Sequence, residues 1–315
     1  MAKSRDIKRR IKSVKNTSKI TRTMELIATA KSQTCQARIR QALPYFQALA
    51  EIAREARRAG GDQDTVHPLL AVRPVKRVAL LVVTANRGLC GGYNGNVLRL
   101  ARDHRARLIE QGVEVKVVVS GKKGINWLKF QKIPYEKQTF TQFEDRPAFG
   151  EVEKVGDLLL GMFQDGEVDR VDVAYTHYYS AGKQGPVIET LLPIGEAAAE
   201  QAPEGGVAHK LKESEAVAAA ARSDGGAAAG PVWLIEPDPR SILDAIFPLQ
   251  AKLHLYRVYL EAATSEQIAR RVAMKNATDN AEEVGRALRM AYNRARQNQI
   301  TKEILEVLGG AEALA

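Results

Sequence analysis

Cysteine and aromatic residues are scarce in this chain. Its 315 residues include two cysteines, Cys35 and Cys90, and neither belongs to a CxxC pair. This scarcity excludes a disulfide framework and the usual cysteine-rich zinc motifs, and it fits a reducing compartment. Aromatic side chains make up only 6% of the residues, so alanine, valine, leucine and isoleucine must form most of the core.

Long apolar runs are missing as well. No run approaches the roughly 20 residues that a helix needs to cross a bilayer. The start of the chain, MAKSRDIKRRIKSVKN, is basic and amphipathic, as a mitochondrial transit peptide would be, but it lacks the apolar core of a secretion signal. The same pattern continues far beyond the length of such a leader. The formal net charge of +10 points to an acidic partner: nucleic acid, anionic lipid or an acidic protein surface.

The first segment, residues 1–58, has the apolar spacing of one long amphipathic helix. Pro44 is expected to kink this helix without ending it, because the periodicity resumes beyond it. Thr17, Ser18 and Thr21 interrupt the stripe with small side chains that let another backbone come close. The predicted stripe consists of Ile7, Ile11, Val14, Ile20, Met24, Ile27, Ile39, Leu43, Phe46, Leu49 and Ile52.

The last segment, residues 241–315, predicts a second long helix. Ser241 is its expected N-cap, with Asp244 three residues on in a capping-box arrangement. Helices of this length cannot bury their stripes in an ordinary globule, so we expect them to pair as an antiparallel coiled coil whose register stays open. The predicted stripe consists of Ile242, Ala245, Leu249, Leu253, Tyr256, Tyr259, Leu260, Ala263, Ile268, Val272, Val284, Leu288, Tyr292, Ile300, Ile304 and Leu308.

The middle of the chain, residues 75–195, has a different pattern. VKRVALLVVT, VEVKVVVSG and VDRVDVAYTHYYS are β-branched runs, PVIETLLPI is a possible fourth strand, and helical stretches lie near 94–111 and 150–164. Strands that alternate with helices predict a Rossmann-like α/β domain with a largely parallel sheet. Residues 196–232 are rich in alanine and glycine without an apolar stripe, which predicts a mobile surface insertion.

The turn after the first strand, NRGLCGGYN, has the order of a phosphate-binding loop: strand, glycine-rich turn, helix. A Walker loop requires GxxxxGK followed by Ser or Thr, but here Tyr93 and Asn94 follow the last glycine pair. The GxGxxG spacing of a dinucleotide site also fails, because the glycines stand at 88, 91, 92 and 95. The favoured interpretation is structural, with the glycines allowing a tight turn that packs a helix against the strand end.

No catalytic constellation emerges from the remaining residues. The five histidines are scattered without an HxxxH or HExxH pair, and no paired carboxylates suggest acid–base work. We therefore predict no catalytic residues, no metal ligands and no bound cofactor. The basic N-terminal segment would suit phosphate or an acidic protein surface. It lacks interleaved aromatic residues until Tyr45, which weakens a nucleic-acid interpretation.

The C-terminal stretch YNRARQNQITKEILEVLGG combines two surfaces. Arg294, Arg296, Gln297 and Thr301 can make hydrogen bonds to a partner. An apolar tip follows and predicts that something covers it. The tip consists of Ile300, Ile304, Leu305 and Leu308.

Several stretches together resemble the gamma subunit of F-type ATP synthases. They are IKSVKNTSKITRTMELIATAK, NRGLCGGYN, EPDPRSILDAIFPL, TSEQIARRVAMKNATDNAEEV and YNRARQNQITKEILEVLGGAEAL, in the order of the family and over nearly the whole chain. The resemblance implies the central rotor shaft of a proton-translocating enzyme, non-catalytic itself, although the sequence does not decide between protons and sodium ions. It implies that the α/β domain binds no nucleotide. It also implies a peripheral position on the cytoplasmic face of a bacterial inner membrane.

The resemblance further implies partners and contact residues. The partners would be the alpha and beta subunits of the catalytic hexamer, the epsilon subunit and the c-subunit ring, with no nucleic acid. Arg296, Gln297 and Thr301 match positions that bind loops of the beta subunits, and the apolar tip suits a bearing. Basic residues of the first helix would face acidic loops of the same ring, with Met24 nearby. These basic residues include Lys8, Arg9 and Lys12.

Two rival hypotheses stay open at the level of the sequence. A basic α/β protein could bind nucleic acid through its N-terminal helix, with an affinity that falls steeply with salt. An enzyme could use the NRGLCGG turn for a dinucleotide.

The insertion at 196–232 contains no cysteine, so thiol regulation of the kind found in chloroplast relatives is not expected.

Overall fold

The structure, a computed structural model, describes residues 2–60, 67–194 and 239–312; within these ranges the side chains of 2–4, 54–60, 239, 306 and 309–312 are not described. The predicted insertion at 196–232 lies outside the described residues. The chain divides into two compact units. The first unit contains Met1–Ala30 and Arg270–Ala315, and the second contains Lys31–Ala269.

Two long helices belong to both units. They are α1 (Ala2–Gly60) and α7 (Pro239–Glu312). α1 continues through Pro44, as the periodicity predicts. α7 begins at Pro239, two residues before the predicted N-cap Ser241, which therefore lies inside the helix. A proline suits the first turn of a helix because its missing N–H would have no partner there.

The second unit contains a five-stranded sheet in the order β3-β2-β1-β4-β5. β1 pairs in parallel with β2 and β4, β2 pairs in parallel with β3, and β5 runs antiparallel to β4. Valine, leucine and isoleucine are concentrated in the central strands, as expected for a sheet covered on both faces. The strands are β1 (Arg77–Val83), β2 (Glu114–Ser120), β3 (Thr139–Phe140), β4 (Arg170–Tyr178) and β5 (Gln184–Leu192).

Helices cover both faces of this sheet. On one face, α2 (Tyr93–Glu110) and α3 (Lys122–Phe130) pack on alternate side chains such as Leu80 and Val82. On the other face, α4 (Phe149–Gln164) and the first half of α7 pack on the intervening side chains such as Leu81. Successive strand residues point to opposite faces, which explains the division into two cores. A short 3-10 helix, η1 (Pro68–Leu70), precedes β1.

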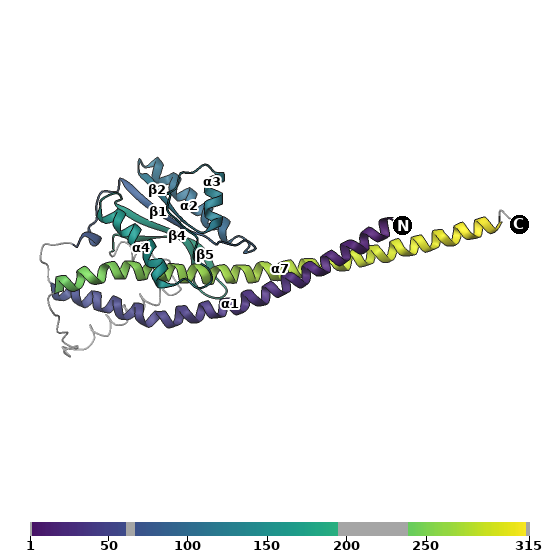
Figure 1. Cartoon of the computed structure of the whole chain (residues 1–315), viewed down its shortest axis with the longest axis horizontal. Coiled ribbons are helices and arrows are strands. Elements are labelled where there is room, and N and C mark those ends of the chain that lie inside the picture. Colours follow the sequence, from purple (N-terminus) through teal and green to yellow (C-terminus); the bar gives the residue numbers. More distant parts are fainter. Residues whose placement is uncertain (1, 61–66, 195–238, 313–315) are drawn as a thin grey trace. The chain divides into compact units, whose positions relative to one another are not determined.

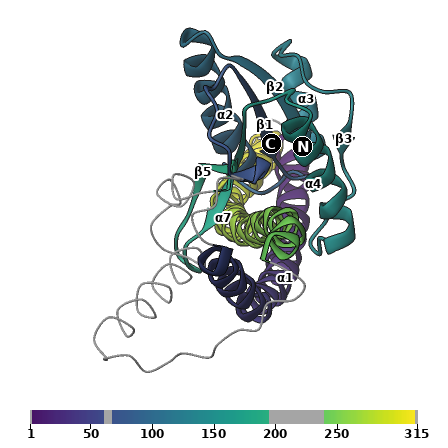
Figure 2. The ribbon, with the colours of Figure 1, turned by 90° about the vertical axis from the view of Figure 1, so that its left-hand side faces the viewer.

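Within the second unit, α7 lies between α1 and the sheet (Figures 1 and 2). Ile39, Phe46 and Leu49 of α1 form a buried cluster with Leu253 and Leu260 of α7. Residues 251–270 of α7 include no exposed residue, because the opposite side of this stretch carries Leu255 and Val258 of the sheet core.

The predicted fold class is confirmed: two long terminal helices accompany an α/β domain with a largely parallel sheet. The four expected strands and the helices near 94–111 and 150–164 are present. The short elements α3 and β3 were not expected, because KKGINWLKF is short and β3 has only two residues. Their signals are too brief for periodicity to reveal.

Candidate functional site

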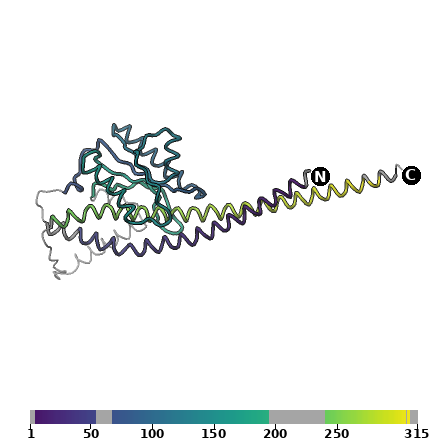
Figure 3. The backbone as a smooth tube through the Cα atoms, viewed as in Figure 1, coloured from purple at the N-terminus to yellow at the C-terminus, as the bar shows by residue number. Residues whose placement is uncertain are grey.

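The first unit pairs the start of α1 with the end of α7 in antiparallel fashion (Figure 3). The hydroxyl oxygens of Thr21 and Thr278 lie 2.7 Å apart, and Val14 lies opposite Gly285. Seven residues back along α1 thus correspond to seven residues forward along α7, which is the repeat of a coiled coil. The prediction that Thr21 allows close approach is correct.

The seam of this unit has few fully buried side chains. Thr21 and Thr278 are buried, and of the described residues in this unit only Ala28 and Met274 are buried hydrophobic ones. In this part of α1, the predicted apolar stripe agrees with the structure at Ile7, Ile11, Val14 and Met24, which are half-buried. It is wrong at Ile20 and Ile27, which are 61% and 51% exposed. A seven-residue repeat selects 14, 21 and 28, so Ile20 and Ile27, each one residue before a repeat position, face away from the partner helix.

Other large apolar side chains of the first unit are exposed. Most residues of the predicted α7 stripe beyond residue 270 are exposed as well, including Val272 and Val284. Eleven described residues of this unit belong to the exposed set: Ile20, Leu26, Ile27, Val272, Val284, Met290, Ile300, Ile304, Leu305, Val307 and Leu308. An exposed apolar surface of this extent marks an interaction site.

The predicted contact residues lie along both helices of this unit and form no single pocket. Arg296, Gln297 and Thr301 are exposed on α7, as are Lys8, Arg9 and Lys12 on α1, whereas Met24 is half-buried. The side chains of the predicted tip are exposed, and α7 continues past the N-terminal end of α1 in this region (Figure 1). The tip residues Ile300, Ile304, Leu305 and Leu308 are 46%, 54%, 63% and 60% exposed, respectively.

In the second unit, residues of the glycine-rich turn and of the start of α2 contact neighbouring elements by hydrogen bonds and apolar packing. The hydroxyl of Tyr93 donates to the carbonyl of Ala262 on α7 over 3.2 Å, and Asn94 Oδ1 accepts from the N–H of Ala85 over 2.9 Å. Cys90 and Tyr93 are buried in a cluster with Ala85 that also touches Ala269 of α7. The polar groups of this turn therefore serve internal packing, in line with the structural interpretation.

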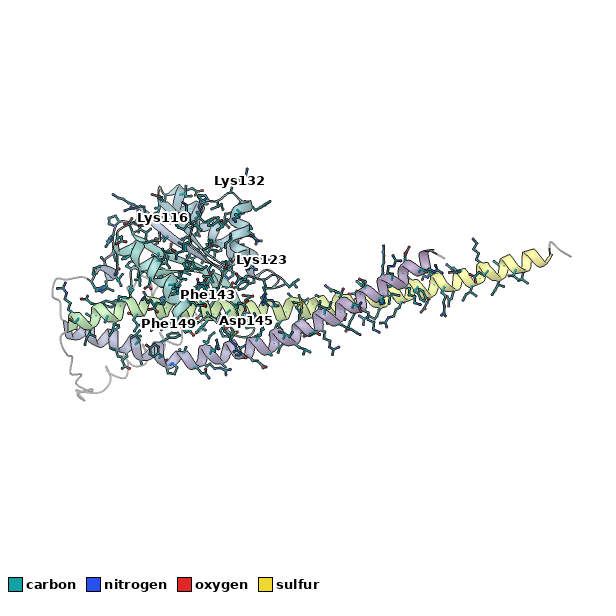
Figure 4. The ribbon with its side chains drawn as sticks, viewed as in Figure 1. Lys116, Lys123, Lys132, Phe143, Asp145 and Phe149 are labelled. Atoms are coloured by element: carbon teal, nitrogen blue, oxygen red, sulfur yellow. The ribbon has the colours of Figure 1, made fainter. Side chains whose placement is uncertain are left out.

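A loop between β3 and α4 holds the α1–α7 pair (Figure 4). Asp145 accepts hydrogen bonds from Lys31 of α1 and Gln267 of α7, and its carbonyl accepts from the Cys35 thiol. The ring of Phe143 stacks on Tyr259 with 4.2 Å between centroids. Burial, followed by the charge of Asp145, raises the pKa of Cys35 to about 11.

A buried ionic cluster joins α7 to β4 and β5. Arg257 donates to Glu189 Oε1 over 2.6 Å, and Glu261 Oε2 lies 2.5 Å from His177 Nδ1. The Tyr175 hydroxyl donates to Glu189 over 2.7 Å. Every one of these five side chains is buried. We call this set the α7 joint.

Electrostatics explains how the α7 joint tolerates its charges. Burial alone would raise the pKa of Glu189, but the charges of Arg257 and His254 outweigh it and hold that pKa well below its usual range. Burial likewise opposes the charge of Arg257, yet Glu189 and Glu261 raise its pKa. Both groups are charged at neutral pH, and each requires the other.

The sequence-based predictions missed the α7 joint. Arg257 and Glu261 stand four residues apart on one helix, and Glu189 interrupts an apolar strand. A charged residue inside an otherwise apolar strand is unusual and is a signal for a buried partner. The identity of that partner depends on which elements pack together.

Among the described residues, no group of three or more His, Cys, Asp or Glu side chains is arranged to hold a metal ion. No described helix is long and apolar enough to span a membrane. The fold defines a class of protein in which an α/β domain is combined with two long paired helices, and the first unit of this chain has an exposed apolar surface.

Comparisons with known proteins identify the family of this chain. The model of the family described as ATP synthase matches residues 3–314. The chain is 42% identical over its full length to an ATP synthase gamma chain from Rhodopirellula baltica, of which 99% is covered. It is 39% identical to an ATP synthase gamma chain from Leptospira biflexa, with both chains fully covered.

The solved structures agree at the level of the fold. A chain in a structure of the Euglena gracilis mitochondrial ATP synthase has a TM-score of 0.65 and 20% identity, over 99% of this chain and 95% of that one. The chain belongs to the ATP synthase gamma chain family. It is a rotor-shaft subunit and not an enzyme in its own right, because catalysis in this complex lies on the beta subunits.

Proposed function

We propose that this chain couples rotation of a membrane c ring to conformational change at catalytic beta subunits. The observation that carries the proposal is the exposed apolar surface of the first unit. Its seam contains small and polar side chains beside half-buried ones such as Val14 and Met24. Eleven large apolar side chains of this unit are exposed, and five of them lie beyond residue 299 of α7, past the N-terminal end of α1 in the register set by Thr21 and Thr278. Exposure of so much apolar surface to water is unfavourable, so we expect a partner to surround these helices with an apolar inner surface. A ring of alpha and beta subunits would provide that inner surface.

Coupling follows from the asymmetry of the two helices. The outer surface of the pair is not uniform: exposed Leu26 and Val272 are apolar, whereas exposed Lys8 and Arg9 are cationic. A shaft without threefold symmetry presents a different face to each beta subunit of a threefold ring. Each orientation then favours one conformation at each site through differential contacts.

Torque would reach the first unit along α7. This helix is continuous over 74 residues and belongs to both units. In the second unit, the α7 joint and the loop with Asp145 hold the helix by hydrogen bonds as well as by apolar packing. Directional bonds resist rotation of the helix about its own axis better than apolar contact, which lets surfaces slide.

We assign the beta-subunit contacts to two groups of residues. Arg296, Gln297 and Thr301 would hydrogen-bond to loops of the beta subunits. Lys8, Arg9, Lys12 and Met24 would face loops of the ring, where the cations favour acidic partners. The bearing would consist of Ile300, Ile304, Leu305 and Leu308, whose exposed side chains give non-directional contact.

The remaining partners follow from related assemblies. The similar structures are titled as an OSCP/F1/c-ring assembly and a rotor of the Euglena enzyme, and as a central stalk and c ring from Tetrahymena thermophila. For this chain we propose the alpha, beta and epsilon subunits and the c ring as partners. We place it on the cytoplasmic face of a bacterial inner membrane, in a proton-translocating enzyme.

The test is ATP-driven rotation of the assembled complex. Replacing Arg296 and Gln297 together by alanine is expected to abolish rotation while the subunits still co-purify. Arg99→Ala, which removes an exposed arginine from α2, is the matched control and should rotate normally. Normal rotation in the double variant would remove the contact assignment. Failure of the chain to co-purify with alpha and beta subunits would remove the proposed function.

A further inference from the structure

One face of the first unit contains a groove whose lining residues are not among the beta-subunit contacts assigned above. It forms where small residues of both helices meet, at Ser18 of α1 and at Ala281 and Gly285 of α7. Val14 lies opposite Gly285, where the absence of a side chain opens the surface. The groove has a volume of about 330 Å³, at the lower end of the range for small-molecule sites.

The groove is strongly cationic. Lys15 and Lys19 line it from α1, one helical turn apart, and Arg286 and Arg289 line it from α7. Glu282 is the one acidic side chain among the lining residues, so the formal charge of the groove is +3. Two cations from each helix thus face the same concave surface.

These cations lack partners in the chain. Within the part of the chain that the structure describes, Lys15, Lys19, Arg286 and Arg289 take part in no ion pair or side-chain hydrogen bond. Like charges one helical turn apart destabilise a helix, and here such pairs stand on both helices. An anion between them would neutralise this repulsion and connect the helices across a seam with few apolar contacts.

We propose that this groove binds a small phosphate anion with two or more negative charges, such as pyrophosphate or the polyphosphate tail of a nucleotide. The two arginines supply planar forks that match phosphate oxygens, and the lysines supply point charges. Ile11 and Val14 also line the groove, and its volume of about 330 Å³ suits a compact anion. The inference stands independently of the rotor function.

Calorimetric titration of the full-length chain with inorganic pyrophosphate tests the proposal, at an ionic strength held constant with potassium chloride. We expect saturable binding with one site per chain. Arg286→Gln with Arg289→Gln should weaken binding by roughly tenfold or more, since charge-assisted bonds are lost. Arg294→Gln is the matched control, because this exposed arginine of α7 does not line the groove, and it should bind like the wild type.

A second pair of variants tests the shape of the groove at constant charge. Gly285→Leu should abolish binding by filling the space. Gly285→Ala should retain it, because an added Cβ meets only Val14 at an ordinary 3.8 Å. Retained circular dichroism in both variants shows that the coiled coil persists. Binding by Gly285→Leu equal to that of the wild type would overturn the assignment of this groove.

Separate titrations with phosphate, AMP and ATP identify the source of the anion. We expect ATP and pyrophosphate to bind and AMP to bind much more weakly. Equal affinity for AMP and ATP would overturn recognition through a polyphosphate. No binding of any of them, with capture of beta subunits weakened by the arginine substitutions, would show instead that the groove is a protein interface.

Discussion

The hydroxyl oxygens of Thr21 and Thr278 lie 2.7 Å apart in the seam between α1 and α7. Each hydroxyl also lies within hydrogen-bond distance of a carbonyl of its own helix, that of Ser18 or that of Met274. Both side chains are buried. The contact between the two hydroxyls therefore holds the helices close together without a large apolar core. The hydrogen bonds to the carbonyls satisfy the hydroxyl groups within their own helices.

The seam residues and their exposed neighbours should respond oppositely to substitution. Thr21→Leu is expected to lower the free energy of unfolding by about 1–3 kcal/mol, because a larger side chain overpacks a buried site. Ile20→Ala should change it by less than about 0.5 kcal/mol, because Ile20 is exposed in the isolated chain. Urea unfolding followed by circular dichroism measures both. The reverse order would mean that Ile20, and not Thr21, lies in the seam.

The α7 joint should be sensitive to loss of its cation. Arg257→Met leaves Glu189 and Glu261 buried without their main partner and is expected to cost about 3–5 kcal/mol. Lys252→Met is the control on the same helix. Lys252 pairs with Glu153 and Asp157, whose side chains are 42% and 59% exposed, so its loss should cost about 1 kcal/mol or less. Equal costs in urea unfolding would contradict the account of the joint.

Acid should weaken the same cluster in a predictable direction. The pKa of Glu189 is lowered in the folded chain, so its contribution is present above the unfolded pKa of about 4.3 and is lost as pH falls through the folded value. In Arg257→Met, burial instead favours protonated Glu189. The difference in unfolding free energy between wild type and this variant should therefore shrink as pH falls from 7 toward 4. A difference that is constant with pH would contradict the prediction.

A side chain at Gly121, directly after β2, should lower the stability of the fold. Gly121 has φ of +99°, and an added Cβ would lie 2.1 Å from the carbonyl oxygen of Thr84. Gly121→Ala is expected to destabilise the chain by about 2 kcal/mol or more, from backbone strain and steric overlap. Gly161→Ala in α4 is the control: its Cβ meets nothing within 4 Å, and alanine favours the helix by up to about 1 kcal/mol. Thermal unfolding distinguishes the two.

Several features of the fold could be predicted because they depend on local sequence. The long helices follow from apolar periodicity, and the strands at 77–83, 114–120 and 170–178 follow from β-branched runs. The missing Walker lysine after the turn was also visible in the sequence. The contact residues Arg296, Gln297 and Thr301 came from a family resemblance and remain a proposal.

Other features depend on register. Ile20 and Thr21 are adjacent in sequence, yet one is 61% exposed and the other buried. A small difference in helical phase decides which of them faces the partner helix, and hydrophobicity alone selects the wrong one. The α7 joint poses the same problem over longer distances, since Glu189 and Arg257 are 68 residues apart.

The amino-acid sequence by itself determined that this chain has two long terminal helices around an α/β domain, because helical and strand periods are properties of neighbouring residues. Only the tertiary structure decided which helical face is the seam, that large apolar residues of the first unit face outward, and which buried charges meet. Those outcomes depend on the packing of one element against another, and packing is set by shape and distance in space.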